Sequence, residues 1–180
     1  MKKLCIFCGS AKGNDPKYMK LGTMIGELLV KNKISLVYGG ASIGLMGAIA
    51  DSVMKNGGTV IGVIPKSLVD YEVAHSGLSQ LFVVDNMHQR KQLMYDNADA
   101  FLSLPGGMGT LDEMFEVLTW AQLKYHSKPS YIFNFEGFYD SLLSYLRHSN
   151  GEGFVKNEHL ELLHEIKNLE ELEKLLLQGV

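Results

Sequence analysis

The sequence predicts an α/β domain built on a doubly wound sheet of six to seven mostly parallel strands, with helices on both faces. Three observations support this fold class. Short apolar runs alternate with longer segments of helical periodicity along the 180 residues, as in repeated strand–crossover–strand units. The apolar runs are continuous rather than alternating with polar residues, which is typical of strands covered on both faces. No repeat, linker or low-complexity segment divides the chain, so we expect a single domain over residues 1–180.

Six runs rich in aliphatic and β-branched residues are expected to be strands, at 3–8, 34–38, 59–64, 81–84, 100–104 and 130–134. The intervening segments repeat apolar residues with a helical period, which predicts helices at 15–31, 44–56, 87–97, 109–124 and 137–148. The C-terminal part, 158–178, is polar and rich in leucine, and we expect one or two further helices there. Ligands of such sheets bind beyond the carboxyl ends of the strands, so the loops after the strands are where a site is expected.

Composition and charge exclude several classes of protein. The chain is 46% hydrophobic and 21% charged with a formal net charge of -3, which is typical of a soluble globular protein and argues against nucleic acid or an anionic membrane as partner. No apolar run reaches the roughly 18 residues of a transmembrane helix. The apolar stretch after the basic start MKK is too short for a signal peptide. We therefore expect a cytoplasmic protein.

The two cysteines, Cys5 and Cys8, form a C-x-x-C motif of the kind that can bind metal or exchange disulfides. In a strand, however, positions three apart point to opposite faces. No second pair is present to complete a zinc site. We interpret both as small buried residues and expect no metal.

Three of the loops that follow expected strands are rich in glycine: CGSAKG (8–13), YGGASIGLMG (38–47) and PGGMGT (105–110). Glycine allows the backbone to approach a ligand closely and to point N–H groups at it. Each loop alone is also explained by a tight strand–helix turn, whereas three at one end of a sheet favour a phosphorylated small molecule. The spacing matches neither the dinucleotide fingerprint G-x-G-x-x-G nor the P-loop G-x-x-x-x-G-K-[ST].

The helix expected at 87–97 carries two cations on the face that should pack on the sheet. Met87, Arg90, Lys91, Met94 and Ala98 share that face, and Arg and Lys are rarely buried without a partner. Either both side chains extend to solvent at the start of the helix, or they face the glycine loops and hold an anion.

The helix expected at 109–124 has one apolar stripe for the sheet, formed by Leu111, Met114, Phe115, Leu118 and Ala121. Its tryptophan, Trp120, lies on the opposite face, where a large apolar residue marks a contact more often than chance exposure. We therefore expect the Trp120 side of this helix to lie at or near the interface of a homodimer.

Two interpretations of Glu113 are open. Thr110-x-x-Glu113 matches a capping box, in which the two side chains bond each other's backbone N–H groups. Alternatively, Glu113 points into a phosphate-binding cleft and activates water or stabilises a cationic transition state. Asp112 lies about 100° round the helix from Glu113 and is not expected to share that role.

Four segments together resemble the LOG (Lonely Guy) family of phosphoribohydrolases: VYGGASIGLMG (37–47), MHQRK (87–91), LPGGMGTLDE (104–113) and EVLTWAQL (116–123). The segments FCGS (7–10) and VIGVIPKSL (60–68) are similar too, so the resemblance covers residues 3 to 150 approximately. It implies a Rossmann-like homodimer without metal or redox cofactor. It also implies hydrolysis of a nucleoside 5′-monophosphate to ribose 5-phosphate and a free base, either an N6-modified adenine (a cytokinin) or the adenine of AMP.

The resemblance also implies site residues. Arg90 and Glu113 correspond to the catalytic pair, and Arg90 either anchors the phosphate or assists the departing base. The implied substrate-binding residues are Glu72, Arg90, Lys91, Gly107, Met108, Gly109, Thr110, Leu111, Asp112, Glu113 and Thr119, with Ser10, Gly40, Gly106 and Met87 expected nearby. Three positions depart from the family pattern: Asp112 replaces the more frequent Glu, Ala41 replaces a common third glycine, and Glu72 lies in DYEVAH rather than after PR.

Other functions were weighed against this one. Some family members are described as lysine decarboxylases, but nothing in this sequence marks a lysine as an attachment site for pyridoxal phosphate. A non-catalytic carrier of a nucleotide-like cofactor is the main alternative, because relatives of this fold have that role. The retained Arg90 and Glu113 favour the enzyme, since a carrier does not need that pair. The missing fingerprint argues against a plain dinucleotide-binding domain.

Overall fold

The computed structural model describes residues 1–178 and contains a seven-stranded sheet with strand order β4-β3-β2-β1-β5-β6-β7. The strands are β1 (Lys3–Phe7), β2 (Ser35–Tyr38), β3 (Val60–Pro65), β4 (Gln80–Val84), β5 (Ala100–Ser103), β6 (Ser130–Phe133) and β7 (Leu163–Ile166). Every neighbouring pair is parallel. The predicted α/β fold is confirmed, and the six expected strands each lie within two residues of an observed one.

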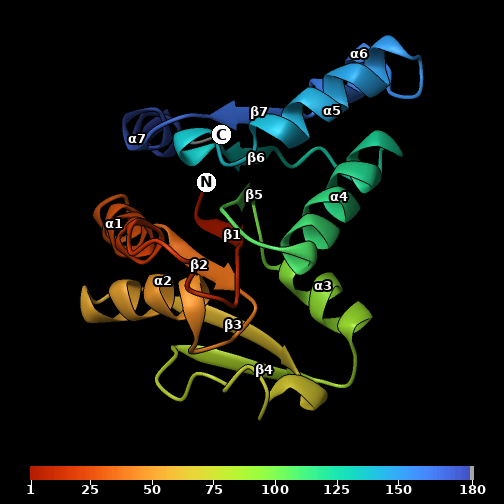
Figure 1. The fold of residues 1–180 in the computed structure, drawn as a ribbon. Helices are drawn as coiled ribbons and strands as arrows, with labels where there is room; N and C mark the ends of the chain where they lie inside the picture. The colour runs from red at the N-terminus through yellow and green to blue at the C-terminus, as the bar shows by residue number, and fades with distance from the viewer. Residues whose placement is uncertain (179–180) are drawn as a thin grey trace.

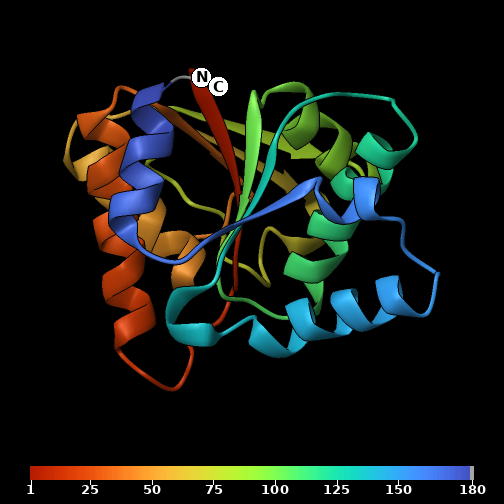
Figure 2. The same ribbon diagram turned by 90° about the horizontal axis from the view of Figure 1, so that it is seen from above.

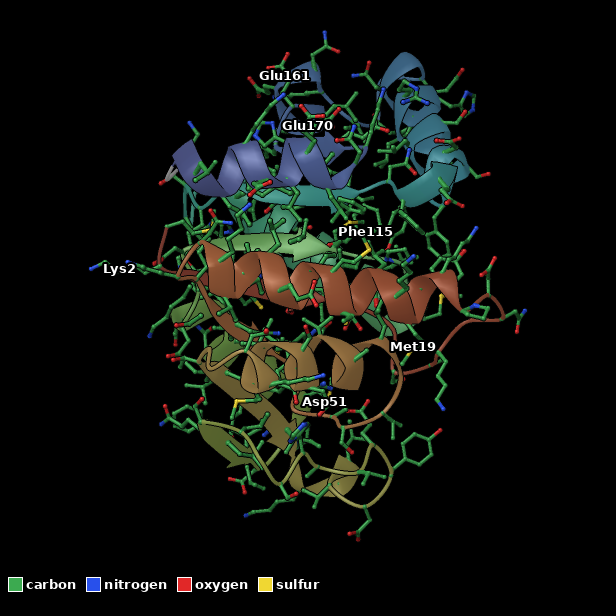
Figure 3. All side chains as sticks on the ribbon, turned by 90° about the vertical axis from the view of Figure 1, so that its left-hand side faces the viewer. Lys2, Met19, Asp51, Phe115, Glu161 and Glu170 are labelled. Atoms are coloured by element: carbon green, nitrogen blue, oxygen red, sulfur yellow. The ribbon has the colours of Figure 1, made fainter. Side chains whose placement is uncertain are left out.

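Helices cover both faces of the sheet (Figures 1 and 2). One face carries α1 (Lys17–Lys31), α2 (Gly44–Lys55) and α7 (Leu169–Gln178), and α1 crosses it between the other two (Figure 3). The opposite face carries α3 (Met87–Asp96), α4 (Met108–Gln122), α5 (Asp140–Gly151) and the short α6 (Asn157–Leu160). Within residues 1–178, no helix has the length and apolar character needed to cross a membrane.

Each face of the sheet buries its own hydrophobic cluster. Cys5 lies in β1 and Cys8 directly follows that strand, and the two side chains belong to different clusters. Cys5 packs in one cluster with Met94 of α3 and Val117 of α4. Cys8 packs in the other with Leu21 and Ile25 of α1. Both thiols are buried and unbonded, and burial raises the pKa of each. The expectation that Cys5 and Cys8 point to opposite faces is therefore confirmed.

The strand order reverses between β1 and β5, the two central strands. From β1 the chain builds outward through β2, β3 and β4, and then returns to the other side of β1 with β5, β6 and β7. The loops that leave β1 and β5 therefore diverge to opposite sides, which opens a crevice at the carboxyl ends of the strands. These two loops touch directly, because Gly9 N donates a hydrogen bond to Pro105 O at 3.2 Å.

The C-terminal region differs from the prediction. The expected helices over 158–178 are present as α6 and α7, but between them residues 163–166 form β7, an edge strand that pairs with β6 from Leu163↔Ser130 to Ile166↔Phe133. His164 and Glu165 of this strand are exposed, whereas Ile166 is buried. A four-residue edge strand with two polar positions carries no clear period in the sequence, so only its pairing with β6 distinguishes it from helix.

Candidate functional site

A cleft of about 310 Å³ opens at the reversal point of the strand order. The loops after β1, β3 and β5 and the first turns of α2, α3 and α4 contribute to its wall, all of them beyond the carboxyl ends of the strands. The lining residues are Cys8, Gly9, Ser10, Ala11, Met46, Leu68, Glu72, Met87, Arg90, Gly107, Met108, Gly109, Thr110, Asp112 and Glu113. The glycine loops after β1 and β5 thus lie in one cavity, as the sequence analysis expected.

Helix α4 begins at Met108, with Gly107 in extended conformation as its N-cap. The first intrahelical bond is donated by Leu111 N to Gly107 O at 3.2 Å. The amides of the preceding first turn lie at the cleft wall, where a helix N-terminus offers N–H groups and a partial positive charge to an anion.

This helix start overturns the capping-box interpretation. Thr110 is not the N-cap but the third residue of α4, and its side chain is buried rather than bonded across the helix end. It packs against Gly106 so closely that a Cβ there would lie 2.1 Å from Thr110 Oγ1. Glu113 is therefore one turn inside the helix, where its side chain lines the cleft.

Arg90 is buried in the first turn of α3, with 4% of its surface exposed. Its Nη2 donates to Gly39 O at 2.9 Å and contacts Glu72 Oε2 at 3.4 Å. Its Nη1 lies 3.9 Å from Met87 Sδ, and its Nε has no hydrogen-bond partner among residues 1–178. Arg90 therefore faces the glycine loop after β2 and the cleft, rather than extending to solvent, and retains an unused donor.

The side chain of Glu113 is partly buried in the cleft wall, and its surroundings change its pKa. Burial raises its pKa from 4.5 to about 7; the charge of Arg90 opposes this rise, whereas those of Asp112 and Glu72 add to it. A carboxyl group with a pKa near neutrality can exchange protons at physiological pH, as catalytic acids and bases do. The thiol of Cys8, in the same wall, has its pKa raised by burial and by Glu113, so it remains protonated.

Lys91 adopts a different arrangement from Arg90. Its Nζ lies 3.2 Å from Asp112 Oδ2 and 3.0 Å from Glu116 Oε1, so it joins α3 to α4. These carboxylates hold its pKa above the ordinary value in spite of the opposing effect of burial. Lys91 is outside the cleft wall, although its partner Asp112 is part of it.

Most of the expected site residues lie on one of two surfaces, the cleft and a groove along α4. Ten of them line the cleft: Ser10, Glu72, Met87, Arg90, Gly107, Met108, Gly109, Thr110, Asp112 and Glu113. Leu111 and Thr119 lie instead in a shallow groove of about 550 Å³ along the outer side of α4, whose wall also includes Met108, Asp112, Phe115, Glu116 and Trp120. Gly106 lines a neighbouring apolar pocket, and Gly40 lies behind the cleft against β3.

The expected sheet-facing stripe of α4 is confirmed in large part: Met114 is buried in a cluster with Ile132 of β6, and Leu111, Phe115 and Leu118 pack against that cluster. Val117, which the expected stripe did not include, is buried as well, and the partly buried Leu111 and Phe115 also contribute to the outer groove. Trp120 is partly buried, with its ring edge-on to Tyr95 at a centroid distance of 5.2 Å.

The predicted site residues did not include five members of the cleft wall: Cys8, Gly9, Ala11, Met46 and Leu68. Cys8 directly follows β1, and Met46 lies in the first turn of α2, so both are at the carboxyl ends of strands. Their position after a strand is the sequence signal that could have identified Cys8 and Met46. No three His, Cys, Asp or Glu side chains of the described chain are grouped where they could hold a metal ion.

Solved structures share this fold at low sequence identity. The molybdenum cofactor carrier protein of Chlamydomonas reinhardtii has a TM-score of 0.74 and 16% identity, covering 99% of this chain and 99% of the other. The molybdenum cofactor binding protein of Rippkaea orientalis has a TM-score of 0.72 and 20% identity, covering 99% and 97%. At this identity the likeness establishes the fold alone.

Sequence relatives are much closer. A family model described as "Possible lysine decarboxylase" matches residues 46–176. The cytokinin riboside 5′-monophosphate phosphoribohydrolase of Rhodococcoides fascians is 48% identical over 155 residues, covering 86% of this chain and 78% of the relative. The Arabidopsis thaliana protein of the same name, LOG7, is 43% identical over 171 residues, covering 95% and 79%. The chain therefore belongs to the LOG family, the cytokinin riboside 5′-monophosphate phosphoribohydrolases.

Proposed function

We propose that this protein hydrolyses the N-glycosidic bond of a purine nucleoside 5′-monophosphate, releasing the free base and ribose 5-phosphate. The observation that carries the proposal is the placement of Glu113, with its pKa raised to about 7, in one cleft with buried Arg90 and the N-terminus of α4. The names of the relatives supply the substrate class, a cytokinin riboside 5′-monophosphate. We include AMP because it has the same ribose 5-phosphate and an unmodified adenine.

Glu113 is the proposed catalytic carboxylate. Cleavage of a ribosyl–base bond passes through an oxocarbenium-like state, in which the sugar carries positive charge at its anomeric carbon. A carboxylate beside that carbon stabilises the charge, or removes a proton from the water that attacks it. In the balanced reaction, the water oxygen bonds to the anomeric carbon, the carbon–nitrogen bond breaks, and the base leaves with a proton.

The amides of the first turn of α4 and the loop 105–107 are the proposed phosphate site. The charged side chains that line the cleft are three carboxylates, Glu72, Asp112 and Glu113, and one cation, Arg90. With so few cations, the backbone must supply much of the attraction for a phosphate. A phosphate bound there would fix the position of the sugar relative to Glu113 and so contribute to catalysis through orientation.

Arg90 is proposed to serve both Glu113 and the substrate. Its positive charge opposes the rise in the pKa of Glu113 and therefore maintains a fraction of carboxylate at neutral pH. Its unpartnered Nε–H is available to an oxygen or nitrogen atom of the substrate.

The test is direct. Purified protein is incubated with isopentenyladenosine monophosphate and with AMP, and free base and ribose 5-phosphate are quantified by chromatography. We expect base release from at least one nucleotide, and a loss of at least about a hundredfold in Glu113→Ala. The control is Glu158→Ala, which removes an exposed carboxylate of α6 and should leave the rate unchanged. Absence of free base, or full activity of Glu113→Ala, contradicts the proposal.

The carrier alternative predicts a different result in the same experiment. A carrier would bind the nucleotide and return it intact, with a dissociation constant measurable by calorimetry and no base in solution. The likeness to molybdenum cofactor carriers is at 16–20% identity and concerns the fold. The proposal of an enzyme draws on relatives at 43–48% identity.

We also propose a homodimer formed through the outer groove of α4. Met108, at this groove, has 86% of its surface exposed, and the partly buried rings of Phe115 and Trp120 lie beside it. Groups of exposed apolar residues of this kind mark association surfaces. Met108 and Asp112 line both the groove and the cleft, so the partner would lie next to the substrate.

A further inference from the structure

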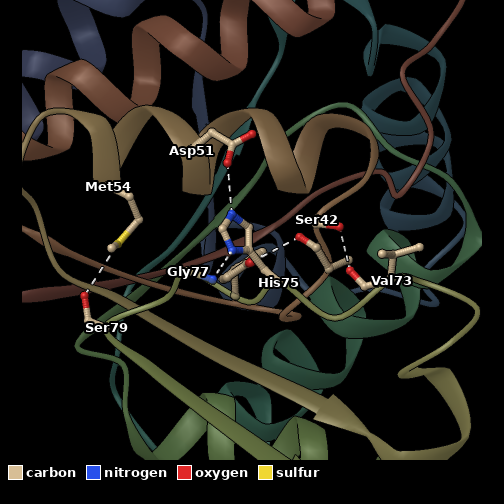
Figure 4. A network of polar contacts seen from close by, with 9 residues as sticks. Ser42, Asp51, Met54, Val73, His75, Gly77 and Ser79 are labelled. Atoms are coloured by element: carbon tan, nitrogen blue, oxygen red, sulfur yellow. Dashed lines mark hydrogen bonds and ion pairs between the residues drawn. The ribbon is translucent and has the colours of Figure 1, made fainter.

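The segment between β3 and β4 carries Glu72 and is fastened to the loop after β2 by a polar network (Figure 4). Both the amide nitrogen and the hydroxyl of Ser42 donate to Val73 O, at 2.9 and 2.7 Å. The amide of His75 donates to Gly40 O at 3.0 Å. These bonds lie on both sides of a backbone bridge between Ala41 and Ala74 in the antiparallel sense.

The backbone at Val73 shows that this fastening holds a strained turn. Val73 has a φ of 50°, in the left-handed region, which is sterically unfavourable for a β-branched residue. Such a conformation persists where the surrounding contacts impose it. The turn directs Glu72 towards Arg90 and returns the next residues to the loop after β2.

His75 links the turn to α2 through Asp51. Gly77 N donates to His75 Nδ1 at 3.1 Å, so this nitrogen is an acceptor and the ring proton is on Nε2. Nε2 is then the donor in its 2.9 Å contact with Asp51 Oδ1. The imidazole is well covered, with 12% of the side chain exposed, whereas Asp51 lies on the outer surface of α2 with 70% exposed (Figure 3).

We propose that Asp51 and His75 are positioning residues, which hold Glu72 against Arg90 in the cleft. The direct contact between Glu72 and Arg90 is long, at 3.4 Å, so it fixes the carboxylate weakly. The remaining restraint on Glu72 comes from the turn and its network. Neither Asp51 nor His75 lines the cleft, so both act through Glu72. This inference rests on the proposed function.

Asp51→Ala is the informative variant. Asp51 is exposed and its contact with His75 is at the surface, so its loss should leave the fold intact. We expect kcat/KM for the cleaved nucleotide to fall about tenfold, which is less than the roughly hundredfold cost of a 1 Å misplacement, because the turn and the Arg90 contact still restrain Glu72. Asp51→Asn keeps an oxygen that accepts from His75 Nε2 and should restore the rate to near wild type. Glu158→Ala, which removes another exposed carboxylate next to a histidine, His159, is the control and should have no effect.

A double-mutant cycle separates positioning from a general structural effect. If Asp51 acts through Glu72, then Asp51→Ala should change kcat/KM by less than about twofold in a Glu72→Ala background. Equal effects in both backgrounds would overturn the proposal. So would an Asp51→Asn variant as impaired as Asp51→Ala.

Hydrogen exchange and AMP binding supply readouts that need no turnover. In Asp51→Ala, the amides of Ser42 and His75 should exchange faster while those of β5 are unchanged, and the Kd for AMP should rise about tenfold. If both changes occur but the wild type releases no base, the proposed hydrolysis fails and the positioning role stands. Unchanged exchange at Ser42 and His75 overturns the positioning role, whatever the activity.

Discussion

The guanidinium of Arg90 and the carbonyl oxygen of Gly39 are joined by a 2.9 Å hydrogen bond, which links the first turn of α3 to the end of β2. The contact is possible because Gly39 has no side chain. A Cβ at this position would lie 2.0 Å from Arg90 Nη2 and 3.0 Å from Met46 Sδ. The glycine after β2 is therefore a condition for burying the cation of the cleft.

Gly39→Ala should consequently displace Arg90 and abolish most of the activity. We expect kcat/KM to fall by at least about a hundredfold, because the guanidinium must move by more than an ångström from Glu72 and the cleft. Gly151→Ala is the matched control: the same substitution in α5, where a Cβ meets nothing within 4 Å. Steady-state kinetics give kcat/KM for both variants. A Gly39→Ala enzyme as active as Gly151→Ala would show that the position of Arg90 is not critical for catalysis.

Glu113→Gln should inactivate the enzyme and stabilise the fold at neutral pH. The pKa of Glu113 is about 7 in the folded protein and 4.5 ordinarily, so the folded state retains a proton that the unfolded state has released. The contribution of Glu113 to the free energy of unfolding therefore decreases as pH rises from about 4.5 to 7, and this decrease is complete above pH 7. The neutral amide avoids this loss. Thermal unfolding should show a gain of about 1–3 kcal/mol at pH 8 that vanishes below pH 4.5; an equal gain at both pH values would contradict the assignment.

On the acidic side of the pH–rate profile, kcat/KM should fall with a midpoint near pH 7, and Asp112→Asn should shift this midpoint to lower pH. As a base or charge stabiliser Glu113 must be ionised, so kcat/KM should fall as pH decreases through its pKa of about 7. The charge of Asp112 raises that pKa, and its removal should shift the midpoint to lower pH. If the fall in kcat/KM came instead from protonation of the substrate phosphate, whose second pKa is about 6, Asp112→Asn would leave its midpoint unchanged.

Thr119→Arg should dissociate the proposed dimer. Thr119 is exposed in the groove of α4, and its hydroxyl bonds only the helix backbone at Phe115 O, so the change introduces bulk and charge without disturbing the core. Light scattering after size exclusion should report a mass near 20.0 kDa instead of twice that mass. Ser144→Arg, at an exposed position of α5, provides the comparison and should leave the mass of the wild type unchanged.

Leu172→Ala tests whether α7 is an integral part of the fold. Leu172 is fully buried in the cluster of α1 and α2, and its truncation should lower the free energy of unfolding by about 2–4 kcal/mol. Leu177→Ala, in the same helix but 70% exposed, should change it by less than about 0.5 kcal/mol. Chemical denaturation measures both, and similar values for the two variants would mean that α7 is only loosely attached.

The sequence predicted the parallel sheet and its helices because their signals are local: continuous apolar runs and helical periods. The edge strand β7 was missed because two of its four residues, His164 and Glu165, are polar and its pairing with β6 is long-range. Likewise, Thr110 and Glu113 match a capping box in the sequence, but α4 begins two residues before Thr110, with Gly107 as its N-cap. The glycine loops, Arg90 and Glu113 could be predicted from motifs that resemble a family.

Other features of the site depend on contacts between distant segments and had no sequence signal of their own. The pairing of Lys91 with Asp112 and Glu116 requires α3 and α4 to lie side by side. The network that joins Asp51 to His75 requires the turn after β3 to fold back over α2. In both cases the residues are ordinary surface types, and their role follows only from the tertiary arrangement.

The central place of β1 in the sheet has a consequence for how the protein is made. β1 leaves the ribosome before the other strands of this sheet, but its second neighbour, β5, follows almost a hundred residues later, with Leu4 paired to Ala100 and Phe7 to Ser103. Until then one edge of β1 is unpaired and exposed to association with other chains. Nascent chains that end before residue 100 should therefore require chaperone protection, and full-length chains should fold slowly for their size.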